Sequence, residues 1–124
     1  MISCLAVILG GSIGAGFRYS LIKLLNKRFG LKHWATFWIN VTGCLFLGYV
    51  LTLALKRPDI VSTDWKLFLA TGIAGSYTTF STFSYENMTL IKSGQILQGI
   101  IYPCASVIIG LLAIGAGHLF AQIS

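Results

Sequence analysis

The chain has 124 residues, of which 56% are hydrophobic and 10% are charged, with a mean hydropathy of +0.82 and a net charge of +6. A soluble domain of this size carries about 25% charged residues, so the composition excludes an ordinary soluble domain. The cations flank apolar segments, which is the placement of lipid headgroup anchors and topology signals. No nucleic-acid partner is therefore expected.

Four apolar stretches are long enough to cross a lipid bilayer, for which about 17–25 residues with few charges suffice. We predict helices at residues 2–25, 34–55, 65–91 and 95–120, which would make residues 1–124 a single integral membrane domain with an all-α fold. The first positive side chain is Arg18, after the first apolar run. This order argues against a cleavable signal peptide, which begins with its positive region.

The charge bias across the predicted membrane is small. One side holds three cations and the other holds five: Lys56, Arg57 and Lys66, against Lys23, Lys27, Arg28, Lys32 and Lys92. Such a weak bias leaves both insertion orientations open. Four helices enclose too little space for a private aqueous pathway, so we expect at least two copies, for which closed two-fold symmetry is the commonest arrangement.

The segment from Gly72 to Ser84 is unusually polar for the centre of a membrane span. It contains two glycines and six serine or threonine side chains, which are Ser76, Thr78, Thr79, Ser81, Thr82 and Ser84. Polar backbone and side chains are tolerated in lipid only where they are packed in protein or line a cavity. We therefore predict that the third helix breaks near Gly75 to Thr79 and that a polar or charged species is handled there.

Three side chains near this break are candidates for contact with a small anion. Asn40 is the only carboxamide inside the second predicted helix, and it suits either an interhelical hydrogen bond or donation to an anion. Phe80 and Phe83 share a helix face because they lie three residues apart. Their rings suit either ordinary packing or attraction of an anion by the positive ring edge.

Hydroxyls and one carboxylate continue the polar stripe. Thr79, Thr82 and Glu86 lie at i, i+3 and i+7, where the hydroxyls either donate to an anion or bond back to their own helix. Glu86 is the only carboxylate expected within or near the hydrocarbon region, which suits a proton relay, a gate or a structural hydrogen bond. Tyr102 and Ser106, four residues apart in the fourth helix, extend the polar track.

Arg18 ends the uncharged part of the first helix. Its guanidinium suits either an interfacial position or an anion-attracting vestibule. The sequence contains no nucleophile–base pair, phosphate-binding loop or metal-ligand cluster, so we do not expect an enzyme.

Three motifs together resemble the CrcB/Fluc family of fluoride channels. Residues 10–19 (GGSIGAGFRY) resemble the family's GGxxGAxxRY opening, and residues 40–43 (NVTG) resemble its asparagine motif in the second helix. Residues 72–86 (GIAGSYTTFSTFSYE) resemble its third-helix signature, GxxGxxTTFSTFxxE. The resemblance covers essentially the whole chain.

The resemblance implies a dual-topology, antiparallel homodimer that exports fluoride passively through two pores from the cytoplasm, across the bacterial inner membrane. It implies that Phe80 and Phe83 line the pores with Asn40 beside them, and that Arg18 lies in the vestibule. The polar track would then consist of Thr79, Thr82, Tyr102 and Ser106. It also implies a structural sodium ion at the dimer centre, coordinated by the backbone carbonyls of Gly75 and Thr78 and by the same two from the second copy.

Two other classes share some of these features. A small dual-topology multidrug exporter, coupled to protons, has the same size and span count. Such exporters depend on a carboxylate in the first helix, and this first helix has none. A non-transporting scaffold subunit would explain the glycine-rich helix faces but not the hydroxyl-rich break.

Overall fold

The computed structural model describes residues 2–124 and is built from helices over that range. Met1, which the predicted membrane domain includes, lies outside the described residues. The three long helices are α1 (Ile2–Phe29), α2 (His33–Lys56) and α6 (Ile96–Ile123). Between α2 and α6 the chain forms α3 (Thr63–Lys66), the π-helix η1 (Leu67–Ala74), α4 (Gly75–Tyr77) and α5 (Phe80–Lys92). The all-α prediction is therefore confirmed.

Membrane-crossing length is found in three of the described helices rather than four. By length and apolar composition, α1, α2 and α6 each suffice for a crossing. The fourth predicted span, residues 65–91, is divided among η1, α4 and α5, so none of its helices reaches that length alone. The helix α1 continues past the predicted end at residue 25, because Lys27 and Arg28 suit a last helical turn and Gly30, with φ 61°, then ends it.

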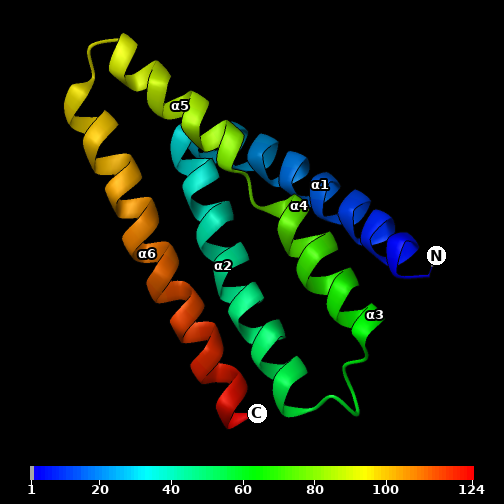
Figure 1. Ribbon diagram of the computed structural model, residues 1–124. Coiled ribbons are helices and arrows are strands. Elements are labelled where there is room, and N and C mark those ends of the chain that lie inside the picture. The colour runs from blue at the N-terminus through cyan, green and yellow to red at the C-terminus, as the bar shows by residue number, and fades with distance from the viewer. Residues whose placement is uncertain (1) are drawn as a thin grey trace.

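The helices pack as two parallel pairs (Figure 1). The helix α1 lies beside η1 and α4, and α2 lies beside α6. The helix α5 continues beyond α4, contacts both α2 and α6, and reaches α6 through a short turn at Gly94. The outer faces of the bundle are apolar and exposed, which is what a lipid-facing surface requires.

Glycines bring the paired backbones into direct contact. A Cβ atom added at Gly10 would meet the carbonyl oxygen of Phe68, and one added at Gly14 would meet that of Ile73. The small residues four apart in α1, which the sequence marks as a packing face, therefore allow close approach to η1. At the far end of the other pair, Lys56 Nζ donates to the carbonyl oxygen of Ala121 at 2.9 Å and so holds α2 to the last turn of α6.

We expect Gly48→Ala to lower stability, because the added methyl group would meet the carbonyl oxygen and Cα of Ile114 in α6. Overpacking of this kind costs about 1–3 kcal/mol. The matched control is Gly115→Ala, since a Cβ at Gly115 meets nothing within 4 Å. Thermal unfolding of both variants in detergent measures the effect. Equal midpoints for the two variants would contradict the close contact between α2 and α6.

Candidate functional site

The backbone between α4 and α5 is extended for two residues. Thr78 has φ −76° and ψ 159°, and Thr79 has φ −150° and ψ 120°. Thr79 caps α5, because its Oγ1 accepts a hydrogen bond from the N–H of Thr82 at 3.3 Å. Within the range predicted for the break, Gly75–Tyr77 are helical, so the extended part is confined to the two threonines.

Asn40 of α2 pairs with the backbone at this interruption and gives the N–H of Thr79 the acceptor that the helix no longer supplies. Its Oδ1 accepts from the N–H of Thr79 at 2.9 Å, and its Nδ2 donates to the carbonyl oxygen of Thr79 at 3.2 Å. A buried backbone left unpaired is costly, and Thr79 is only 7% exposed. Asn40, for which the sequence left an interhelical hydrogen bond and donation to an anion open, therefore joins α2 to the backbone of Thr79. One of its two Nδ2 hydrogens remains for another acceptor.

An open hollow of about 280 Å³ lies at the break. Five of the residues predicted for the fluoride pathway line it together: Asn40, Thr79, Phe80, Phe83 and Ser106. Apart from Thr78, the other lining residues were not predicted as site residues; they are Gly43, Cys44, Leu47 and Val107. Spacing could have indicated two of them as lining residues, because Gly43 and Leu47 lie three and seven residues after Asn40 on the same face of α2. No lining side chain is charged, so the hollow does not repel an anion by fixed negative charge.

The two phenylalanines occupy different environments beside this hollow. Phe80 is 79% exposed, whereas Phe83 is half-buried and packs against the cluster of Phe37, Leu90 and Tyr102. The ring centroids of Phe80 and Phe83 are 5.8 Å apart with the planes tilted by 40°. The Phe83 ring is thus fixed by packing, while the Phe80 ring projects from the surface of the single chain.

Glu86 and Tyr102 form a separate polar cluster, so Tyr102 does not line the hollow. Glu86 Oε1 accepts from Thr36 Oγ1 at 2.8 Å, and Glu86 Oε2 accepts from the hydroxyl of Tyr102 at 2.8 Å. Thr36 and Tyr102 are fully buried. The carboxylate therefore joins α5 to α2 and α6. Thr36 was not predicted as a site residue, although its position four residues before Asn40 puts both polar side chains on one face of α2.

We expect Tyr102→Phe to destabilise the chain, because it removes a buried hydroxyl that donates to a carboxylate. A hydrogen bond to a charged group contributes about 1.5–3 kcal/mol. Tyr85→Phe is the matched control, since Tyr85 lies one residue before Glu86 and is 75% exposed. Unfolding in urea measures both variants, and an unchanged midpoint for Tyr102→Phe would argue against the bridge.

The remaining predicted residues lie around the hollow in different ways. Ser106 lines it while its Oγ donates to the carbonyl oxygen of Tyr102, in its own helix, at 2.7 Å. Thr82 Oγ1 accepts from Thr79 Oγ1 at 3.1 Å and is not among the lining residues. Arg18 is half-buried on α1 and is also not among them.

The carbonyl groups of Gly75 and Thr78 lose their helical donors at the break. In a continuous α-helix they would accept from the N–H groups of residues 79 and 82. The N–H of Thr79 donates to Asn40 instead, and the N–H of Thr82 donates to Thr79 Oγ1. Two carbonyl oxygens are thereby released from the helical ladder, and oxygen is the donor type that hard cations prefer.

A second polar hollow, of about 450 Å³, lies next to Glu86 where α1 meets α2 and α5 meets α6. Its lining includes four ionisable side chains, which are Lys32, His33, Tyr85 and Glu86. The Nε2 atom of His33 is buried and has no hydrogen-bond partner among the described residues. No local sequence pattern indicates this hollow, because its residues come from the region between α1 and α2 and from the end of α5 with the turn that follows it.

Comparison with known proteins identifies the family. The family described as "CrcB-like protein, Camphor Resistance (CrcB)" matches residues 5–118. The chain is 42% identical to the fluoride-specific ion channel FluC of Chlorobium phaeobacteroides, over 96% of this chain and 92% of that protein. It is 44% identical to the FluC of Synechocystis, over 97% of this chain and 92% of that protein. It is 43% identical to the FluC of Chloroflexus aurantiacus, over 94% of this chain and 93% of that protein.

These similarities agree with the motifs in the sequence and with the apolar helices of the structure. Ion channels are not enzymes, so the names of the relatives also agree with the expectation that the chain is not one. Since the family match spans most of the chain and the relatives are more than 40% identical over nearly their full length, this membrane protein belongs to the CrcB-like family.

Proposed function

We propose that the chain is a fluoride-selective channel that carries fluoride passively out of the cytoplasm and so confers fluoride resistance. The observation that carries this proposal is its similarity, over almost the whole length, to relatives named as fluoride-specific ion channels. The uncharged hollow at the break supports it, because this hollow brings an amide and hydroxyls together with two aromatic rings.

In the proposed pathway, fluoride passes through the hollow and exchanges part of its hydration shell for protein donors. The second Nδ2 hydrogen of Asn40 is the free donor beside it, since the proton of the Ser106 hydroxyl is already donated to the carbonyl oxygen of Tyr102. The rings of Phe80 and Phe83 contribute positive edges, which attract a small anion weakly enough for it to leave. A narrow passage of this kind excludes chloride, which is larger.

A second copy would complete the pathway. The hollow is open on one side, and the Phe80 ring beside it is 79% exposed in the single chain. An aromatic ring of this size gains about 1.5–3 kcal/mol on full burial. We infer an antiparallel homodimer with two pores, which the weak charge bias between the two ends of the helices permits.

Sodium fits the break as a structural ion at the centre of such a dimer. The carbonyl oxygens of Gly75 and Thr78 would hold it, together with the same two from the second copy. When bound, the ion supplies a fixed positive charge that favours an anion nearby. The chain's own contribution is to release these two carbonyls from the helical ladder, through the hydrogen bonds of Asn40 and Thr79.

Growth on fluoride tests the proposal in cells. Bacteria that lack their own fluoride exporter and express this chain in the inner membrane should grow at a fluoride concentration that stops the parent strain. The same strain with the Phe83→Ile chain, expressed to the same level, should stop growing. Absence of rescue by wild-type protein that is present in the membrane would contradict the proposal.

A further inference from the structure

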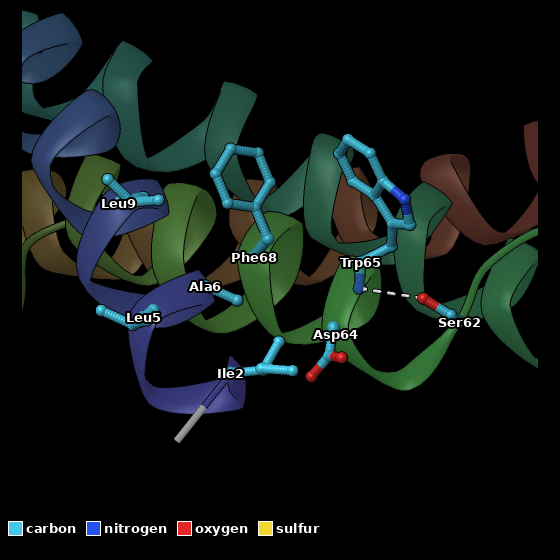
Figure 2. Close-up of a pocket in the computed structure, with 8 residues that line it drawn as sticks. All are labelled: Ile2, Leu5, Ala6, Leu9, Ser62, Asp64, Trp65 and Phe68. Atoms are coloured by element: carbon cyan, nitrogen blue, oxygen red, sulfur yellow. Dashed lines mark hydrogen bonds between the residues drawn. The ribbon is translucent and has the colours of Figure 1, made fainter.

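A third hollow, of about 460 Å³, lies between the beginning of α1 and the beginning of the α3–η1 segment. Its α1 wall is an apolar row at i, i+3, i+4 and i+7, consisting of Ile2, Leu5, Ala6 and Leu9. Figure 2 shows the rings of Trp65 and Phe68 across from this row. Its volume falls within the about 300–1,000 Å³ of small-molecule sites. The hollow does not share a lining residue with the hollow at the break.

One carboxylate stands at the edge of this apolar space. Among the described residues that line the hollow, Asp64 alone is charged, and it lies beside Ile2 at the lower margin of the hollow in Figure 2. Its Oδ1 accepts a hydrogen bond from Ser3 Oγ at 2.8 Å, which fixes the side chain toward α1. No hydrogen bond to Oδ2 occurs among the described residues, so this oxygen is available to a donor.

The position of the hollow suits the boundary between water and hydrocarbon. The apolar row begins where α1 begins, and Asp64 and Trp65 lie at the start of the segment packed beside it. Tryptophan is enriched at this boundary because its ring is amphipathic. An occupant would therefore meet a negative charge at the membrane surface and apolar side chains below it.

We propose that this hollow binds a phospholipid whose headgroup carries a primary ammonium, as in phosphatidylethanolamine. The ammonium donates to Oδ2 of Asp64, and one acyl chain lies between the α1 row and Phe68. A quaternary ammonium cannot donate a hydrogen bond to the carboxylate, and an anionic headgroup is repelled by it.

Native mass spectrometry of the purified protein tests this site with two lipids that differ only in the headgroup. Phosphatidylethanolamine should bind about tenfold more tightly than phosphatidylcholine with the same acyl chains, since a hydrogen bond to a charged group is worth about one decade of affinity. Asp64→Asn should bring the ratio close to one while keeping an oxygen for Ser3. Asp59→Asn is the matched control, because Asp59 is a 70% exposed loop acid paired only loosely with Arg57 at 3.9 Å.

A second variant separates the lipid from other occupants. Leu9→Trp fills the hollow and should lower the binding of both lipids. Equal binding of the two lipids by wild-type protein would overturn the proposal, as would an unchanged ratio in Asp64→Asn. If Leu9→Trp weakens dimer formation while the binding of both lipids stays at the wild-type level, the hollow is a contact between copies and the proposal fails. These readouts involve no fluoride flux, so they stand apart from the proposed channel function.

Discussion

Replacing Phe83 or Phe80 with isoleucine is expected to reduce fluoride efflux from liposomes to the level of protein-free vesicles. Isoleucine keeps a large apolar side chain but has no ring edge to attract an anion. Phe83 is the more constrained of the two, because its ring lies 5.2 Å from that of Tyr102 at an angle of 46°. Efflux is read with a fluoride electrode, and assembly is read by size-exclusion chromatography of the same preparation.

Phe120→Ile is the matched control for this loss. Phe120 lies in the last turns of α6, is 55% exposed and does not line the hollow at the break. Its replacement should leave the efflux rate unchanged. Wild-type flux in Phe80→Ile and in Phe83→Ile would show that the rings do not line the pathway.

The second large effect is expected from Asn40→Asp, which should also abolish fluoride efflux. An ionised aspartate still accepts from the N–H of Thr79, but it cannot donate to the Thr79 carbonyl or to a passing anion. It also places a negative charge in a hollow whose other lining side chains are uncharged. The loss of the buried partner should lower stability by about 1–3 kcal/mol.

Asn26→Asp provides the same chemical change at an exposed position near the end of α1. It should leave both efflux and the unfolding midpoint close to wild type. An Asn40→Asp protein that conducts fluoride normally would show that the amide is needed neither for the pathway nor for the geometry of the break. If Asn40→Asp lowers the unfolding midpoint but conducts fluoride normally, Asn40 has a structural role and no role in the fluoride pathway.

The positions of the long helices and one packing face could be predicted from the sequence, because charge-free apolar stretches and glycine spacing are local features. The hydroxyl-rich segment that includes Thr78 and Thr79 indicated irregular backbone, and those two residues are the extended ones. The π-helix at Leu67–Ala74 was not predicted, since its apolar sequence fits an α-helix equally well. The π-helix packs against α1, and local sequence does not encode such a tertiary contact.

The predicted site residues fall into two groups, at the hollow and at Glu86, because different helix faces meet at the two places. Motif positions on α2 and α5 brought Asn40, Phe80 and Phe83 to one hollow. Tyr102 was grouped with the polar track because it lies four residues before Ser106. Its hydroxyl instead reaches Glu86, because the ring lies on the side of α6 that faces α5. Sequence spacing gives the face of one helix but not which neighbour that face meets.

Fluoride efflux from liposomes that contain the purified protein is the most direct test of the channel assignment. The vesicles are loaded with fluoride or, in a parallel preparation, with chloride, and release is started with a potassium ionophore so that charge movement does not limit it. We expect rapid fluoride release, with chloride release no faster than from protein-free vesicles. Absence of fluoride release from a folded, reconstituted protein, or equal release of the two anions, would contradict the channel assignment.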